Sequence, residues 1–260
     1  MIGHAQARES GGEFRLRIED LDPSRCRPEF IDGIFEDMDW LGLAVDGPPI
    51  VQSGRTQLYQ QALDRLKADG LVYACFCTRA EIAQSLTAPH GDAGTQYPGT
   101  CRPLPDDPER RATTPHCWRL DSSRALKVGG LPGWTETGGA RFESKPGDFG
   151  DAILARKDAP SSYHLACVVD DAASGVNLVV RGEDLRPSTP TQRLLQNLLG
   201  LPEPAYLHHP LVTHEDGRRL AKRDQAPTLA VMRTEGVDGL VLAEQLIEGR
   251  LPLGFRLSGA

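Results

Sequence analysis

The sequence has no apolar run long enough to span a bilayer, and its first residues do not form a signal-peptide pattern. These absences argue against a membrane protein and predict a cytoplasmic one. The sequence also has no excess of positive charge, since 29 basic and 36 acidic residues give a net charge of −7. This balance argues against a generic nucleic-acid binder that depends on overall basic charge, but it does not exclude a local basic face.

The six cysteines do not have the pattern of a disulfide framework, because three of them lie close together in the sequence. This distribution is typical of a reducing compartment. The other three cysteines stand alone, and we expect them to be small buried hydrophobic residues. The isolated cysteines are Cys26, Cys117 and Cys167.

The three clustered thiols are accompanied by a phenol. Cys75 and Cys77 are separated by one residue, and Tyr97 lies four residues before Cys101. Zn²⁺ favours thiolates and has little directional preference, so it tolerates one oxygen ligand in a tetrahedral site. The pattern predicts a zinc site formed by these four side chains, one ion per chain. The ion would be structural, because four protein ligands leave no position for water.

Two alternatives to this ligand set remain open. In the first, Cys75 and Cys77 alternate across a strand, one buried and one exposed, and Cys101 is unrelated to them. In the second, a histidine replaces the tyrosine, since imidazole is a common zinc ligand. The candidates for that exchange are His90 and His116.

The periodicity of apolar residues predicts strands that alternate with helices, which indicates an α/β core with parallel strands. A turn rich in aspartate is expected at residues 170–175, between segments 163–169 and 176–180. We expect its aspartates to shape the turn and to contact substrate or tRNA, without binding a metal. Strands are expected at 13–18, 71–76 and 151–156, and helices at 28–42, from Ser53 to Gly70, at 189–199, and as two short helices within 229–249.

The segment of residues 85–147 is rich in Gly, Pro, Thr and charged residues and has no sustained periodicity. We expect it to belong to an insert that a metal holds together. The predicted organisation is a core of residues 1–74 and 148–228, a zinc-binding insert of residues 75–147, and a short helical C-terminal segment of residues 229–260.

Five short stretches carry residues that suit a binding site. They are Ile2–Ala5, Arg17–Asp22, Tyr163–Asp171, Val180–Leu185 and Arg219–Arg223. In this order and at these intervals they resemble the catalytic core of class I glutamyl-tRNA synthetases. Within that group the chain is most similar to the glutamyl-queuosine tRNA(Asp) synthetases, which lack an anticodon-binding domain. The cysteine and tyrosine pattern also resembles the zinc site of that family.

The resemblance implies a Rossmann-like catalytic core that activates L-glutamate with ATP and Mg²⁺. The glutamate would then be transferred to queuosine in the anticodon loop of tRNA(Asp). The resemblance also suggests a monomer. Two other functions stay open, namely a truncated glutamyl-tRNA synthetase and a non-catalytic RNA-binding remnant.

The resemblance assigns site residues by position. Glu19, Tyr163 and Arg181 would line the glutamate pocket, and Arg181 would bind the γ-carboxylate, because its planar fork suits a carboxylate. His4 matches the second histidine of the family's nucleotide-binding signature and would act on ATP at the start of a helix. The first histidine of that signature has no counterpart, since Met1 stands at its position, and the preceding strand and a glutamate-binding arginine are also missing. We expect either a start codon assigned too late or a truncated, inactive product.

The fifth stretch resembles the mobile Lys-Met-Ser-Lys-Ser loop of class I synthetases. Here it reads Arg219, Leu220, Ala221, Lys222 and Arg223. Lys222 would stabilise the transition state at the triphosphate of ATP, and Arg219 would assist in ATP binding. Because Ala221 replaces the serine, one hydroxyl donor of the family pattern is absent.

Overall fold

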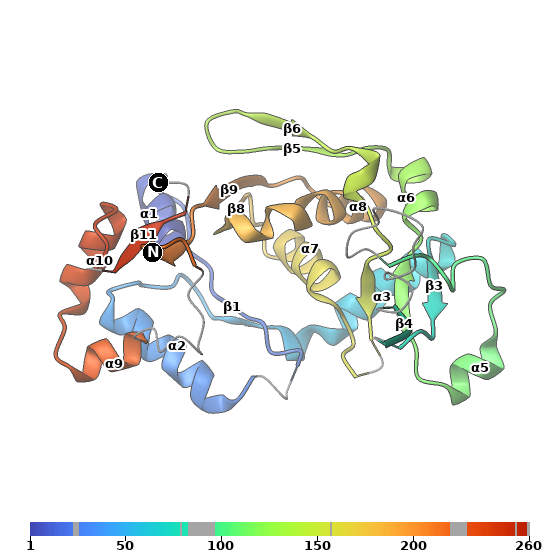
Figure 1. Cartoon of the computed structure of the whole chain (residues 1–260), viewed down its shortest axis with the longest axis horizontal. Coiled ribbons are helices and arrows are strands. Elements are labelled where there is room, and N and C mark those ends of the chain that lie inside the picture. The colour runs from blue at the N-terminus through green and yellow to red at the C-terminus, as the bar shows by residue number, and fades with distance from the viewer. Residues whose placement is uncertain are drawn as a thin grey trace. The chain divides into compact units, whose positions relative to one another are not determined.

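The computed structural model describes residues 1–22, 26–78, 80–82, 97–156, 158–218, 228–252 and 254–258. The chain divides into two compact units, and each is formed by segments that are distant in the sequence (Figure 1). Unit 1 consists of Met1–Ser53, Val180–Arg186 and His208–Ala260, and unit 2 of Gly54–Val179 and Pro187–Leu207. The helices in the described part of the chain are too short or too polar to cross a membrane.

In its described residues, unit 1 contains two small two-stranded sheets and four α-helices. The strands β1 and β2 are parallel, with Arg17 opposite Ile50, and β10 and β11 are antiparallel, with Thr213 opposite Arg256. Its elements are α1 (Ile2–Glu9), β1 (Arg17–Ile18), α2 (Pro28–Trp40), β2 (Ile50–Val51), β10 (Val212–His214), α9 (Leu229–Thr234), α10 (Gly239–Ile247) and β11 (Phe255–Leu257).

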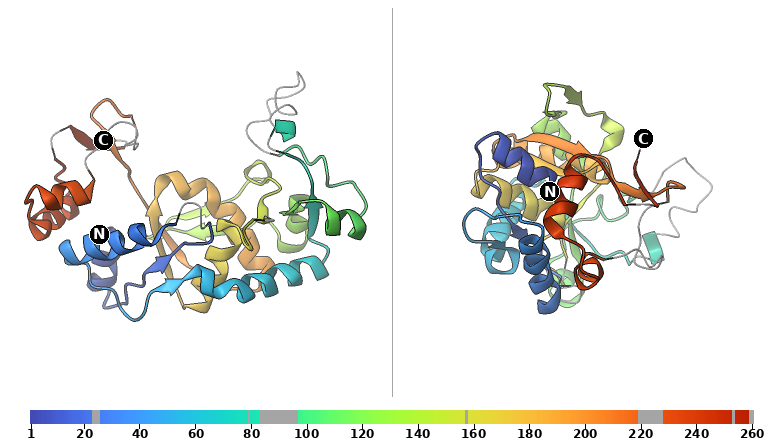
Figure 2. Two further views of the ribbon diagram at one scale, coloured as in Figure 1. Left: turned by 90° about the horizontal axis from the view of Figure 1, so that it is seen from below. Right: turned by 90° about the vertical axis from the view of Figure 1, so that its left-hand side faces the viewer.

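The core of unit 1 lies where the end of α2 meets the two C-terminal helices, which are red in Figure 2. Leu41, Leu242 and Ala243 are buried there. A Cβ at position 239 would collide with the carbonyl oxygen of Trp40, so only glycine permits this close approach. Arg233 on α9 forms ion pairs with Glu36 and Asp37 on α2, which fix the same contact at the surface.

Unit 2 is a mixed α/β unit around a three-stranded antiparallel sheet of order β3-β4-β7. Two strands, β8 and β9, continue from this unit into unit 1 and pair with each other. The elements are α3 (Thr56–Ala68), β3 (Val72–Cys75), α5 (Pro108–Thr113), β4 (Cys117–Leu120), α6 (Ser122–Gly129), β5 (Gly133–Thr135), β6 (Arg141–Glu143), β7 (Ile153–Ala155), α7 (Tyr163–Ala173), β8 (Leu178–Gly182), α8 (Thr189–Leu199) and β9 (Ala205–His209).

The main hydrophobic core of unit 2 is built by α3, α7 and α8 with the sheet. Each helix contributes apolar residues at helical spacing, for example Leu63 and Leu66 on α3, Leu165 and Val168 on α7, and Leu194 and Leu198 on α8. Full burial of one such side chain stabilises the fold by about 1.5–3 kcal/mol. This apolar stripe explains why α8 forms over the residues predicted for it.

A buried carboxylate joins α3 to α7. Asp170 is completely buried, and its oxygens accept hydrogen bonds from Arg55 Nε at 2.7 Å and from the Tyr59 hydroxyl at 2.8 Å. The predicted turn at residues 170–175 is therefore wrong at its start, because α7 continues to Ala173. Asp170 therefore has an internal structural role, since it links α7 to Tyr59 and Arg55.

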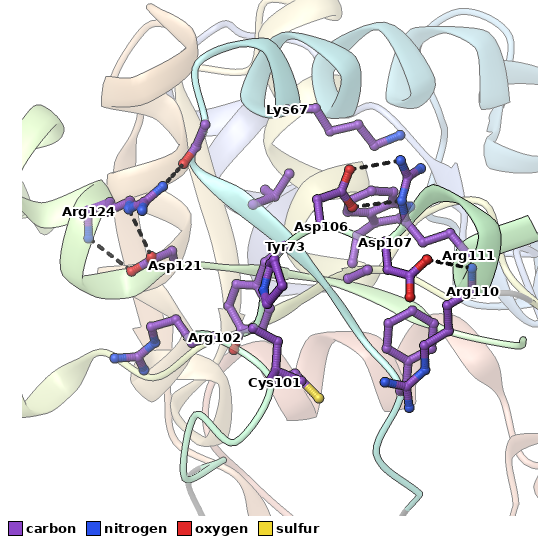
Figure 3. A pocket seen from close by; sticks show the side chains of 17 residues that line it. Lys67, Tyr73, Cys101, Arg102, Asp106, Asp107, Arg110, Arg111, Asp121 and Arg124 are labelled. Carbon is purple, nitrogen blue, oxygen red and sulfur yellow. Dashed lines mark hydrogen bonds and ion pairs between the residues drawn. The ribbon is translucent and has the colours of Figure 1, made fainter.

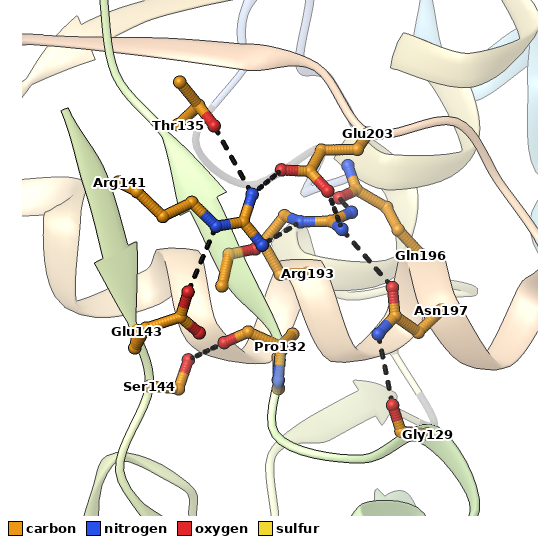
Figure 4. A network of polar contacts seen from close by, with 11 residues as sticks. Gly129, Pro132, Thr135, Arg141, Glu143, Ser144, Arg193, Gln196, Asn197 and Glu203 are labelled. Carbon is orange, nitrogen blue, oxygen red and sulfur yellow. Dashed lines mark hydrogen bonds and ion pairs between the residues drawn. The ribbon is translucent and has the colours of Figure 1, made fainter. Parts of the chain in front are cut away.

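The hairpin of β5 and β6 is attached to α8 by a polar network (Figure 4). Arg193 of α8 is buried and donates to the Gly133 carbonyl at 3.1 Å and to Glu203 at 2.7 Å. Glu203 also accepts from Arg141 on β6 at 3.0 Å. The second half of the segment predicted as an insert is thus anchored to a helix of unit 2.

Several predicted elements are confirmed, among them α2, α8, the strand β3 and the two short C-terminal helices. Two details are wrong. The helix expected from Ser53 begins only at Thr56, because Ser53 lies in a 3₁₀ turn of residues Gln52–Arg55 that precedes α3. The prediction of parallel strands holds for β1 and β2, whereas the pairs β3–β4, β4–β7, β5–β6 and β10–β11 are antiparallel. The predicted domain boundaries stay a prediction.

Candidate functional site

Three cysteines meet at the end of β3. Cys75 is the last residue of the strand, Cys77 follows it, and Cys101 lies in a turn. Their sulfur atoms lie within 4.8 Å of one another, and the Sγ atoms of Cys77 and Cys101 are 3.4 Å apart. The alternative in which Cys101 is unrelated to the other two is therefore wrong. This group is the one cluster of His, Cys, Asp and Glu side chains in the described part of the chain that could hold a metal ion.

Tyr97 points into the same group. Its Oη lies 3.3 Å from the Sγ atoms of both Cys75 and Cys77, and it accepts a hydrogen bond from the Cys101 backbone N–H at 2.9 Å. Burial, followed by the neighbouring thiols, raises the pKa of the Tyr97 phenol. A phenolate at this position therefore needs a cation among these atoms to offset its charge.

The two histidines that could replace Tyr97 as a zinc ligand are His90 and His116. His90 lies outside the described residues. The ring of His116 lies between those of Phe76 and Trp118, with centroids 5.5 Å from each, and its Nδ1 is 3.1 Å from the Thr114 carbonyl oxygen. The oxygen of Tyr97, in contrast, lies 3.3 Å from two of the sulfur atoms.

Cys117 is a fourth thiol that the sequence did not associate with the cluster. It lies directly opposite Cys75 in the register of β3 and β4. A hydrogen bond from Cys117, helped by weaker ones that include Arg119, lowers the pKa of Cys75 to about 4 despite burial. The expectation that Cys117 is an isolated hydrophobic residue is therefore wrong. Burial raises the pKa of Cys77 to about 11, so Cys75 and Cys77 differ in acidity.

The buried carboxylate of Asp151 holds the turn that carries Cys101 in place. Asp151 accepts hydrogen bonds from the Tyr73 hydroxyl at 2.6 Å, from the Ser122 hydroxyl at 2.7 Å and from Arg102 Nε at 2.7 Å. Arg102 directly follows Cys101, so Asp151 ties the turn that carries this cysteine to β3 and α6. Burial alone would raise the pKa of Asp151, but these hydrogen bonds outweigh burial and lower the pKa.

A cleft of about 660 Å³ opens beside Cys101 and was not predicted from the sequence (Figure 3). The cations of Lys67 and Arg110 lie 4.4 and 4.1 Å from the ring centroids of Trp118 and Phe76. Asp106 and Asp121 also line the cleft and form ion pairs with Arg111 and Arg124. The basic lining residues are Lys67, Arg102, Arg110, Arg111 and Arg124.

Three residues that the family resemblance singled out lie in unit 1. His4 is on α1, and its ring packs edge-on against Phe14 at 5.5 Å. Burial, then the nearby Arg8, lowers the pKa of His4, so the imidazole is neutral near pH 7. Its Nε2 is buried and has no hydrogen-bond partner among the described residues. Glu19 follows β1 and forms an ion pair with Arg17 at 3.2 Å.

Arg181 lies near the end of β8 and is buried, and its Nε donates a hydrogen bond to His208 Nε2 at 3.1 Å. The helix that carries His4 comes close to this strand, because a Cβ at Gly3 would lie 3.5 Å from Val180 Cβ. Tyr163 is the first residue of α7 and belongs to unit 2. The predicted loop of residues 219–223, with Lys222, lies outside the described residues.

A family model described as "tRNA synthetases class I (E and Q), catalytic domain" matches residues 1–259. The chain belongs to this family. The chain is 43% identical over 248 residues to the "Glutamyl-Q tRNA(Asp) synthetase" of Rhodobacter capsulatus, covering 91% of this chain and 88% of that protein. It is 49% identical over 235 residues to the protein of the same name from Nocardia farcinica, covering 88% of this chain and 71% of the relative.

The fold is also similar to that of a solved class I synthetase. The crystal structure of the glutamate-tRNA synthetase of Elizabethkingia anophelis matches with a TM-score of 0.70 and 26% identity, over 85% of this chain. The chain spans about half the length of that synthetase, covering 48% of it. The predicted class I synthetase fold and the predicted ligase class are confirmed.

Proposed function

We propose that this chain activates L-glutamate with ATP and transfers it to queuosine in the anticodon loop of tRNA(Asp). The observation that carries the proposal is the match to proteins with that printed name at 43% and 49% identity over about nine tenths of the chain. The buried Arg181 supports the first substrate, because a guanidinium is the side chain best suited to the γ-carboxylate of glutamate.

The reaction consists of two substitutions. The α-carboxylate oxygen of glutamate attacks the α-phosphorus of ATP, which forms glutamyl-adenylate and expels pyrophosphate. A hydroxyl of the cyclopentenediol ring of queuosine then attacks the carbonyl carbon, loses its proton and displaces AMP. The protein contributes mainly positioning and charge stabilisation to both steps.

The roles of the site residues belong to this proposal. Arg181 binds the γ-carboxylate, Glu19 pairs with the α-amino group, and Tyr163 lines the same glutamate pocket. His4 acts at the phosphates as a neutral donor, which agrees with its lowered pKa and with a buried Nε2 that has no partner among the described residues. Lys222 neutralises charge on the triphosphate of ATP. Arg219, three residues before it in the sequence, assists in ATP binding.

The proposed metal is one structural zinc ion held by Cys75, Cys77, Tyr97 and Cys101. The donor set fits zinc, because three sulfur atoms within 4.8 Å supply the soft thiolates that zinc favours, and a phenol oxygen 3.3 Å from two of them supplies a fourth ligand that zinc also accepts. When bound, zinc would supply a cross-link between the end of β3 and the turn at Cys101. The separate zinc-bearing insert and the monomeric state are part of the same proposal.

Two assays test the activation and the acceptor separately. Glutamate-dependent exchange of pyrophosphate into ATP tests activation, and a folded protein without exchange would refute it. Transfer of radiolabelled glutamate is then compared on tRNA(Asp) with queuosine, tRNA(Asp) with the unmodified guanosine, and tRNA(Glu). We expect labelling of the first tRNA alone, whereas labelling of tRNA(Glu) would establish the glutamyl-tRNA synthetase alternative.

A further inference from the structure

A hydrogen bond between Arg181 and His208 connects two paired strands in unit 1. Arg181 is 9% exposed and lies on β8, His208 lies on β9, and the Arg181 Nε and His208 Nε2 atoms are 3.1 Å apart. The backbones of β8 and β9 are themselves hydrogen-bonded to each other. Both ends of the contact are therefore held by regular structure.

The chemistry of the two side chains fixes the direction of this bond. A guanidinium has only N–H donors, so Nε of Arg181 donates and Nε2 of His208 accepts through its lone pair. His208 must then be neutral, with its proton on Nδ1. Because the bond engages Nε, it sets the plane of the guanidinium and directs the edge formed by Nη1 and Nη2 away from His208.

We propose that His208 is a positioning residue for glutamate recognition, which it achieves by holding the guanidinium of Arg181. This inference rests on the proposed function, in which Arg181 binds the γ-carboxylate. A carboxylate presents two acceptor oxygens to two parallel N–H groups, whereas the amide of glutamine presents one acceptor and one NH₂ donor. A fixed guanidinium therefore rejects glutamine, and one that can rotate discriminates less.

The neighbouring residue offers a matched control. His209 follows His208 on the same strand, so its side chain points to the opposite face of the strand. The His209 Nδ1 atom lies 2.9 Å from the Pro210 carbonyl oxygen. A substitution at His209 therefore perturbs β9 without touching the hydrogen bond to Arg181.

The test compares His208→Phe, His208→Gln and His209→Phe in the full chain by pyrophosphate exchange. Phenylalanine keeps the ring and removes the acceptor, while glutamine places an amide oxygen near the position of Nε2. For His208→Phe we expect KM for glutamate to rise by about 10- to 100-fold and KM for ATP to stay within about twofold. The preference for glutamate over glutamine should fall by a similar factor. His208→Gln and His209→Phe should stay within about threefold of the unmodified chain.

A direct measurement of the hydrogen bond accompanies the kinetics. The ¹⁵N resonance of Arg181 Nε, assigned by its loss in Arg181→Lys, should show a scalar coupling to His208 Nε2 that disappears in His208→Phe. If His208→Phe fails to fold, His208→Asn replaces it, because the shorter side chain places its oxygen out of reach of Arg181.

The outcomes separate the inference from the proposed function. An active chain in which His208→Phe keeps its KM for glutamate and its preference over glutamine overturns the role of His208. A folded chain that shows the coupling but neither exchanges pyrophosphate nor binds glutamate in a calorimetric titration refutes the proposed function. In that case it also removes the substrate role of the pair.

Discussion

Cys117 faces Cys75 across the antiparallel pair of β3 and β4, and a hydrogen bond between their thiols makes Cys75 acidic. The sulfur atoms near the end of β3 therefore have two different roles. Cys75 belongs to the group that can hold a metal ion together with Cys77 and Cys101. Cys117 does not belong to that group and acts on Cys75 as a hydrogen-bond donor.

The first prediction concerns the proposed zinc ligands. Replacing Cys101 with serine removes one of three sulfur atoms that lie within 4.8 Å of one another. We expect the purified protein to contain about one zinc ion per chain and Cys101→Ser to contain close to none, since a structural site depends on all of its ligands. Elemental analysis by mass spectrometry measures the content. The control is Cys167→Ala on α7, which should retain the metal, and zinc at full occupancy in Cys101→Ser would mean that the ligands are misassigned.

The second prediction separates Cys117 from the ligands. Because Cys117 is a partner of Cys75 and not a member of the metal group, Cys117→Ala should still bind about one zinc ion. The affinity should fall by about 10- to 100-fold, as when hydrogen-bond partners of metal ligands are lost. Competition with a chromogenic chelator measures the affinity. Cys117→Ser keeps a donor at the same place and should lie between Cys117→Ala and the unmodified chain.

The sequence indicated that Cys75, Cys77 and Cys101 lie together, because all three belong to a short segment and their spacing carries the information. It did not predict the role of Cys117, since the contact with Cys75 depends on the pairing of strands that are more than 40 residues apart. Asp170 shows the same limit, because its partner Tyr59 is 111 positions away. An aspartate pair followed by small residues is typical of a turn, and only the burial against α3 reveals that the helix continues.

Arg181 and Glu19 were predicted as site residues from the sequence only through the resemblance to a family. Nothing in the local pattern connects Arg181 with His208, which is 27 positions away and becomes a neighbour through the pairing of β8 and β9. Contacts within one segment can thus be predicted from the sequence, whereas contacts between strands need the fold. The cleft beside Cys101 belongs to the second kind, because Lys67, Arg110 and Trp118 come from three different elements.

The third prediction tests the buried ion pair of α3 and α7. Asp170→Ala leaves the guanidinium of Arg55 and the hydroxyl of Tyr59 without their shared acceptor. We expect the free energy of unfolding to fall by about 3 kcal/mol, the lower end for a broken buried pair, because the Arg55 side chain is partly exposed. Urea denaturation followed by circular dichroism measures it. The control Asp171→Ala changes the neighbouring aspartate and should cost less than about 1 kcal/mol; equal losses in both variants would contradict the role of the buried pair.

The fourth prediction follows from the lowered pKa of Asp151. The ordinary pKa of this carboxyl group is 3.8, and its value in the folded protein is lower. The unfolded chain therefore binds a proton at a higher pH than the folded chain. Asp151 thus stabilises the fold fully only well above pH 3.8, and this effect is lost as the pH falls below 3.8 through the lower pKa of the folded state. The difference in unfolding free energy between the unmodified chain and Asp151→Asn should therefore shrink as the pH falls below 3.8. The control is Asp32→Asn, a substitution of an exposed residue, whose free energy of unfolding should match that of the unmodified chain at each pH. A difference in unfolding free energy between Asp151→Asn and the unmodified chain that stays constant with pH would contradict the prediction.

The last prediction concerns the charge of Arg181 itself. Arg181→Gln removes the guanidinium proposed to bind the γ-carboxylate and leaves a neutral amide in a buried position. We expect kcat/KM for glutamate in pyrophosphate exchange to fall by about 100-fold or more, because a charge-assisted bidentate contact contributes about 3 kcal/mol. The loss for glutamine should be much smaller, because an amide side chain gains little from a cation. Arg186→Gln, a nearby arginine on the same stretch of unit 1, serves as the control. An equal loss of activity toward both amino acids would show that Arg181 maintains the fold of the site and does not read the charge of the substrate.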